Sequence, residues 1–151
     1  MAMTMSGEVP LAAPRERVWA MLNDPAVLKS CIPGCEQFGN NANNEFHAVA
    51  TVKVGPVKAR WKGKVRLSDL DPPNSYRISG EGEGGVAGFA KGGATVSLAD
   101  RDGGTLLSYN VEAQIGGKLA QLGQRLINSA AKKTADDFFA KFAEAVSPKQ
   151  S

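Results

Sequence analysis

Two cysteines and one histidine are the side chains of this sequence best suited to bind a metal or act as a nucleophile. Cys31 and Cys35 are four residues apart, and His47 is the only histidine. A structural zinc site needs four such ligands, so these three residues leave its coordination set incomplete. A Ser–His or Cys–His catalytic pair would also need His47, which shares the outward strand parity of Lys53. The sequence therefore predicts neither a metal site nor a catalytic residue.

Paired carboxylates are the other groups that could perform acid–base chemistry. The pairs are Asp69 with Asp71, Glu81 with Glu83, and Asp136 with Asp137. Their positions indicate turns, outward strand positions or a helix flank, where no apolar surroundings would raise a carboxyl pKa. The glycine-rich stretch GEGEGG (80–85) neither follows a parallel strand nor opens a helix, so it does not predict a phosphate-binding loop.

Basic side chains alternate along the stretch VKARWKGKVRL (57–67). The cations are Lys58, Arg60, Lys62, Lys64 and Arg66. Because strand side chains point alternately to the two faces, these cations share one face. Two interpretations stay open: a contact surface for anionic lipid headgroups or an acidic partner subunit, or an ordinary solvated outer face. Nucleic-acid binding is not predicted, because no aromatic residues are interleaved on this face.

Acidic residues on the next strand should neutralise part of this basic face. A turn at residues 71–74 would set Lys62 opposite Glu81 and Arg60 opposite Glu83. Such exposed pairs contribute only about 0.2–1 kcal/mol each. The same pairing sets Arg66 opposite Arg77. We therefore expect Lys58, Lys64 and Arg66 to keep unanswered charges.

The opposite face of the same strand is apolar and contains gaps. The predicted pairing sets Val65 near Ile78, Gly63 near Gly80, and Trp61 near Gly82. Missing side chains would leave a cavity suited to a quinone-like or lipid-like molecule. The residues expected to line it are Trp61, Tyr76, Gly82, Phe89, Tyr109, Leu119, Leu122 and Leu126. The glycines are equally consistent with sharp twist and bulging of a filled sheet, so both interpretations stay open at this point.

The elements that position these residues follow from hydrophobic periodicity. Alternation near residues 3–9 predicts a first strand, and two short helices follow, starting at Pro14 and Pro25. Six further strands are predicted at 35–38, 45–54, 57–70, 75–82, 89–98 and 105–115. Helical spacing from Gly116 to Ser147 predicts one long helix of about 45 Å. Short links imply an antiparallel meander covered by this helix, an α+β fold.

Length and composition indicate one ordinary globular domain. The chain has 151 residues and a formal net charge of +3, with 42% hydrophobic residues. We expect a single domain at 1–147 and a short tail at 148–151. No signal peptide and no apolar run near 18 residues is visible, so we expect a cytoplasmic protein with reduced thiols.

Three stretches carry a resemblance to a known family. They are LNDPAVLKSCIPGCE (22–36), GPVKARWKGKVRLSDLDPPNSYRISGEGEGGVAGFAKGGATVSL (55–98) and GGKLAQLGQRLI (116–127). Together they resemble the family of the carbon monoxide dehydrogenase G subunit, within the START-like (SRPBCC, helix-grip) superfamily. The resemblance implies a curved antiparallel sheet of about seven strands wrapped around a long C-terminal helix. Longer relatives carry a linker and an apolar C-terminal tail, so we expect any membrane contact here to use the folded surface.

The resemblance also implies a function. Members of this family accompany molybdenum hydroxylases such as carbon monoxide dehydrogenase, are thought to recruit them to the cytoplasmic membrane, and in some cases bind quinone. We therefore expect a non-enzymatic accessory protein without a covalent cofactor, with bound quinone or lipid, and peripheral on the inner face of the membrane. Two alternatives stay open: a polyketide cyclase-like enzyme using Tyr76 and Tyr109 as an inward polar dyad, and a scaffold without a cavity.

Overall fold

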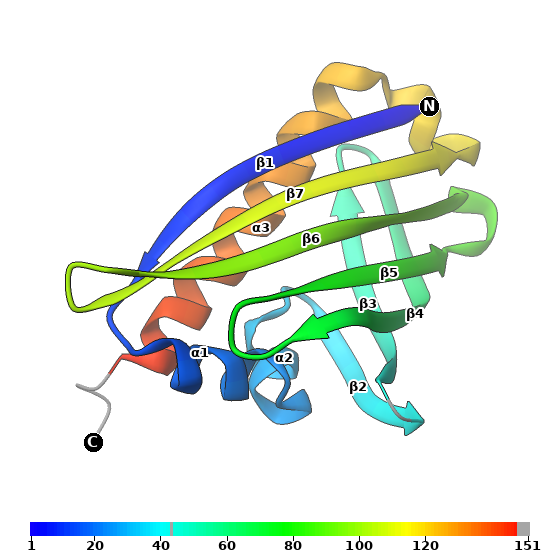
Figure 1. The fold of residues 1–151 in the computed structure, drawn as a ribbon. Coiled ribbons are helices and arrows are strands. Elements are labelled where there is room, and N and C mark those ends of the chain that lie inside the picture. Colours follow the sequence, from blue (N-terminus) through cyan, green and yellow to red (C-terminus); the bar gives the residue numbers. More distant parts are fainter. Residues whose placement is uncertain (43, 148–151) are drawn as a thin grey trace.

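The computed structural model describes residues 1–42 and 44–147 of the chain, which form one antiparallel sheet and three α-helices (Figure 1). The strands are β1 (Ala2–Leu11), β2 (Cys35–Ala42), β3 (Glu45–Val54), β4 (Val57–Asp71), β5 (Ser75–Glu83), β6 (Phe89–Arg101) and β7 (Gly104–Gly116). The helices are α1 (Arg15–Leu22), α2 (Pro25–Cys31) and α3 (Gln124–Val146), with two 3₁₀ segments, η1 (Gly85–Ala87) and η2 (Gly117–Leu122).

The sheet order is β1-β7-β6-β5-β4-β3-β2, so every link from β2 to β7 joins neighbouring strands. The short turns seen in the sequence make this meander antiparallel. The sheet curves around α3, which covers its inner face, while α1 and α2 lie at one end (Figure 1). The α+β helix-grip fold predicted from the sequence is confirmed.

The two short helices begin where their turn chemistry predicts. Asp24 caps α2 by accepting a hydrogen bond from the backbone N–H of Ala26 at 3.0 Å, and Pro25 occupies the first helical position. Proline suits this position because its missing N–H would have no partner there. After α2 the chain turns at Gly34, whose φ of +72° favours glycine.

The single long helix predicted for residues 116–147 is wrong in its first quarter. Residues 117–122 form η2, and α3 begins only at Gln124. Gly123 between them has a φ of +93°, a left-handed conformation that ends helical hydrogen bonding. The break resets the helical phase, so the buried stripe of α3 runs through Ile127, Phe142 and Val146.

The predicted register between β4 and β5 is wrong by two residues. The turn closes with Asp71 opposite Ser75, and a one-residue bulge on β4, where Asp69 has a φ of +51°, then brings Ser68 opposite Arg77. Gly63 therefore lies opposite Gly82, and Val65 lies opposite Gly80. The shift keeps the parity of the strand, so each side chain stays on the predicted face.

The buried core between sheet and helices is divided into two clusters. The first surrounds the C-terminal half of α3 and the two short helices, with Val18, Leu107 and Phe142 fully buried. The second lies at the other end, around Met3, Ile115, Leu119 and Ile127.

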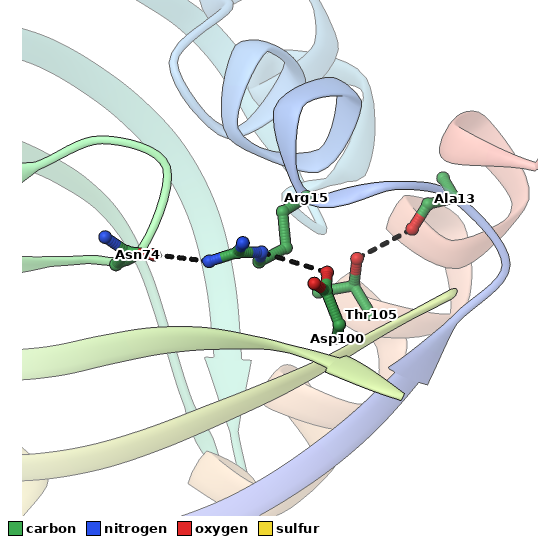
Figure 2. A network of polar contacts seen from close by, with 5 residues as sticks. All are labelled: Ala13, Arg15, Asn74, Asp100 and Thr105. Carbon is green, nitrogen blue, oxygen red and sulfur yellow. Dashed lines mark hydrogen bonds and ion pairs between the residues drawn. The ribbon is translucent and has the colours of Figure 1, made fainter. Parts of the chain in front are cut away.

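A network of polar contacts joins α1 and the residues before it to the end of the sheet (Figure 2). Arg15, the first residue of α1, donates from Nε to Asp100 Oδ1 at 2.9 Å and from Nη1 to Asn74 Oδ1. It thereby links the β4–β5 turn to the end of β6. Beside it, the Thr105 hydroxyl donates to the Ala13 carbonyl at 2.7 Å, and Thr105 is only 2% exposed. These contacts therefore join α1 and the segment before it to the strand ends.

Replacing Thr105 with valine should destabilise the fold by about 1–3 kcal/mol. The isosteric side chain keeps the packing but leaves the Ala13 carbonyl without its donor in a buried site. Urea denaturation measures the free energy of unfolding. The control is Thr4→Val, because Thr4 lies exposed on β1. Equal unfolding free energies for the two variants would contradict this role for the Thr105 hydroxyl.

Candidate functional site

The inner face of β4 and β5 carries glycine at three positions where the two strands pair: Gly63, Gly80 and Gly82. A Cβ added at Gly82 would meet only Lys62 O at 3.5 Å and the Gly63 Cα at 3.8 Å. At Gly63 and Gly80 the nearest atoms likewise belong to the adjacent strand, not to α3. No side chain from the helix therefore occupies the positions directly above these three glycines.

The inner-face residues around these glycines are only half-buried. Val65, Ile78 and Ala94 sit on the three central strands, yet each retains intermediate exposure. In a close-packed core the middle of the sheet would be its most buried part. Val65 and Ile78 lie at the edge of the first cluster and Ala131 of α3 lies at the edge of the second, so only a narrow strip of small residues on the sheet separates the two clusters.

Two aromatic side chains expected at a cavity lie over other glycines. The indole of Trp61 covers Gly84, where an added Cβ would lie 2.9 Å from the ring. The ring of Tyr109 covers Gly7 on the neighbouring strand and stacks on Phe139, with centroids 5.2 Å apart. Each ring fills the space that its glycine leaves, so both residues border the small-residue strip rather than occupy it.

Tyr76 faces inward from the central strand β5 and is 4% exposed. Its ring packs edge-on against Trp19 of α1, with centroids 5.2 Å apart. Burial raises the pKa of its phenol well above the ordinary range, so the group remains a protonated donor. Leu119, buried, and Leu122, half-buried, belong to the second cluster with Trp61.

Phe89 and Leu126 do not lie where the sequence predicted. Phe89 is 48% exposed and lies on the outer face, over Gly116 of β7. Its odd-numbered position on β6 gives it the parity opposite to Ala90 and Ala94. Leu126 is 36% exposed and covers Gly55 in the β3–β4 turn, because the break at Gly123 rotates it away from the sheet. Neither residue lines the inner strip.

The basic face of β4 is more neutralised than predicted. Arg66 pairs with Glu45 at 3.0 Å, and Arg60 pairs with Glu36 at 3.2 Å, both through acids on the β2–β3 side. The expectation that Arg66 keeps an unanswered charge is therefore wrong. Arg77, predicted to face Arg66, instead pairs with Glu112 at 2.8 Å.

The register shift also changes the partners of the lysines. Lys64 lies opposite Glu81 and Lys62 opposite Glu83. An open depression of about 630 Å³ crosses this outer face, lined by side chains of both charges. Among the β4 cations in the described chain, only Lys58, at the start of the strand, has another cation as its cross-strand neighbour, Lys53. The unbalanced positive charge therefore lies at the end of the strand.

No metal site occurs in the described part of the chain, and its two free thiols are buried or half-buried. No group of three or more His, Cys, Asp or Glu side chains there could hold a metal ion. His47 is exposed on β3. Cys31 is 1% exposed, and burial raises the pKa of its thiol, against smaller opposing effects of Ser30 and Lys141. Cys35 is half-buried and donates to the Gln37 carbonyl at 3.3 Å.

A protein-family model for the G subunit of carbon monoxide dehydrogenase (CoxG) matches residues 7–147. The chain belongs to this CoxG family. The family name implies an accessory role beside carbon monoxide dehydrogenase, a molybdenum hydroxylase. No curated protein matches the sequence. None of the helices within residues 1–42 and 44–147 combines the length and apolar character that a membrane span requires.

Solved structures agree with the CoxG assignment at the level of the fold. A conserved protein from Geobacillus kaustophilus is 31% identical, with a TM-score of 0.90 over 95% of each chain. A protein from Thermus thermophilus is 16% identical, with a TM-score of 0.73 over 99% of this chain and 100% of its own. The Zhui aromatase/cyclase from Streptomyces is 13% identical, with a TM-score of 0.70, covering 97% and 94%.

The two thiols should differ sharply in reactivity towards a disulfide reagent at pH 8. Burial raises the pKa of the Cys35 thiol too, but this half-buried group should still react faster than Cys31, which should react only as the protein opens, because the attacking thiolate must be accessible. Absorbance of the released thiolate counts both groups, with urea-unfolded protein as the reference for two. In the Cys35→Ser variant only slow reaction should remain; rapid labelling of that variant would contradict the placement of Cys31.

Proposed function

We propose that this CoxG-family protein is a non-enzymatic carrier that binds an apolar small molecule between the sheet and α3. Quinones and lipids are the chemical classes that fit best. The protein would serve a molybdenum hydroxylase of the carbon monoxide dehydrogenase type. We refer to the proposed binding space, bordered by Gly63, Gly80 and Gly82, as the inner cavity.

The divided core is the observation that carries this proposal. Two apolar clusters are separated by glycines and alanines, and the inner positions between them are half-buried. Burial of apolar ligand surface in such a space contributes about 25 cal/mol per Å² before ordering costs are subtracted. A ligand would thus supply the contacts that the chain's own side chains leave unmade.

Tyr76 supports a ligand that carries a polar end. Its protonated phenol faces inward from β5. No fully buried side-chain oxygen in the described residues lacks a hydrogen-bond partner, so a ligand oxygen would add a bond to the phenol rather than relieve a burial cost. A carbonyl oxygen, such as that of a quinone or an ester, is the matching acceptor. Trp61, Leu119 and Leu122 would contact the apolar remainder of the molecule at the other end.

A cyclase-like reaction has weaker support. The aromatase/cyclase neighbours share the fold at 13% identity, which says nothing of chemistry. Tyr76 and Tyr109 lie on strands separated by β6, with Val96 between them, or roughly 10 Å at the usual strand spacing. The Tyr109 hydroxyl also points over Gly7, on the side away from Tyr76. The two groups are therefore poorly placed to act on one atom.

Filling the inner cavity should abolish ligand uptake while preserving the fold. In the variant Gly82→Leu the new Cβ meets ordinary contacts of 3.5 Å and 3.8 Å, so the side chain can enter the space without displacing backbone. We expect the variant to lose at least tenfold in affinity for an apolar fluorophore such as 1-anilinonaphthalene-8-sulfonate. Fluorescence titration measures the affinity, and thermal unfolding confirms that the variant is folded.

The matched control is Gly39→Leu, which adds the same side chain to β2, where an added Cβ meets nothing within 4 Å. This control should bind the fluorophore as wild type does. If Gly82→Leu also binds it with wild-type affinity, or if wild type binds neither the fluorophore nor a short-chain quinone, the proposed function is wrong.

A further inference from the structure

Four strands carry one row of side chains across the outer face of the sheet, the face turned away from α3. Val49 of β3 lies opposite Lys62 of β4. Glu83 of β5 lies opposite Lys62 on one side and opposite Phe89 of β6 on the other. Residues directly opposite on antiparallel strands point to the same face. The row therefore runs apolar, cation, anion, apolar, so that a reversed copy of it presents an apolar residue to each apolar residue and an opposite charge to each charge.

The neighbouring row repeats the charges of the two central strands. Lys64 of β4 lies opposite Glu81 of β5. Outside this pair, His47 of β3 lies opposite Lys64, and Lys91 of β6 lies opposite Glu81. The two rows together set a pair of lysines on β4 beside a pair of glutamates on β5.

The lysines and glutamates of these two rows form no ion pair within the described part of the chain. An exposed ion that already has a partner on its own sheet gains little from a second one, whereas an unpaired ion keeps its full capacity for an external contact. The arginines that flank the rows are already paired: Arg60 with Glu36, Arg66 with Glu45, and Arg77 with Glu112. The charges left for an external contact therefore lie in the middle of the outer face.

The outer face is hollowed where these two rows cross it. The lysines and glutamates of both rows line a depression of about 600 Å³. Phe89 lies at the edge of this depression and is 48% exposed, and Val49 at the other end of the first row is half-buried. The face thus offers a projecting aromatic ring together with room for a second one.

We propose that two copies of this chain pack outer face to outer face in a symmetric dimer. A two-fold axis that runs parallel to the strands, between β4 and β5, lays β4 of each copy over β5 of the other. Lys62 then meets Glu83 of the partner subunit, and the same rotation sets Lys64 against the partner's Glu81. Because β3 and β6 also exchange places, Phe89 meets the partner's Val49.

The charge pattern favours a second copy over a different partner. An acidic surface would meet the glutamates of β5 as well as the lysines of β4, and a basic surface would meet the lysines as well as the glutamates, so each would bring like charges together. Under the two-fold rotation every charge of β4 and β5 in the two rows faces an opposite charge, and each contact occurs twice. At the end of the second row Lys91 meets the partner's His47, so the attraction is concentrated on β4 and β5. The inference goes beyond the proposed function, because the outer face lies on the other side of the sheet from the inner cavity.

Sedimentation velocity over a wide range of protein concentrations tests the dimer. Wild-type protein should approach twice the mass of the chain as its concentration rises. The variants Lys62→Glu with Lys64→Glu, and Glu81→Lys with Glu83→Lys, should each raise the dissociation constant of the dimer at least tenfold, because symmetry repeats every lost contact. Phe89→Ser should raise it severalfold without any change of charge. Circular dichroism confirms that each variant is folded.

A mixture of the two charge variants is the sharpest arm of the experiment. The first variant carries acids on both β4 and β5, and the second carries cations on both, so their equimolar mixture should form a mixed dimer that neither variant forms alone. The matched control is Lys118→Glu with Arg125→Glu, which makes the same change of net charge at exposed cations of η2 and α3. This control should dimerise like wild type.

Three results would overturn the proposal. They are a wild-type protein that stays monomeric at every concentration, folded charge variants whose mixture stays monomeric, and a control that weakens the dimer as much as the charge variants do. The first result would leave the outer face to a different partner. The outer-face variants should take up the apolar fluorophore like wild type, so loss of uptake by wild type would overturn the carrier function alone, and a monomeric protein that takes up the fluorophore would overturn the dimer alone.

Discussion

Three glycines on the inner face of β4 and β5 leave positions without side chains between the sheet and α3. Gly63 lies opposite Gly82, and Gly80 lies opposite Val65. Only atoms of the sheet lie within 4 Å of the positions that Cβ atoms at the three glycines would occupy. Phe138 and Phe142 fill one end of this space, and Leu119 with Ile127 fills the other. An unfilled middle would be costly because protein interiors are close-packed, and a bound ligand would offset that cost.

The two ends of the molecule differ in how their segments are held together. At one end Arg15 and Thr105 join α1 to the strand turns, and a large buried cluster closes the interior (Figure 2). At the other end, glycines with left-handed φ at Gly85, Gly88 and Gly117 connect short 3₁₀ segments, and apolar residues are exposed.

Much of the fold could be predicted from the sequence because its signals are local. Proline and aspartate mark the starts of the short helices, alternation marks the strands, and parity assigns Lys62 and Trp61 to opposite faces. The register of β4 with β5 could not be predicted, because registers that differ by two residues place the same side chains on the same faces and so give the same alternation. The apolar stripe predicted for one continuous helix is also wrong before Gly123. The left-handed φ of this residue separates residues 117–122 from α3, so the two segments do not share one helical phase. The contact of Phe89 with the outer face, and the pairing of Arg66 with Glu45, depend on these tertiary details.

Native mass spectrometry of the protein as purified under mild conditions tests the central claim most directly. A chain whose sheet and helix enclose an apolar space should carry a fraction of molecules heavier by the mass of one small organic compound, and Gly82→Leu protein should lack it. Organic extraction followed by mass analysis would assign that compound to the quinones or the lipids. A spectrum that shows only the bare polypeptide, before and after incubation with a quinone and a phospholipid, would contradict the account.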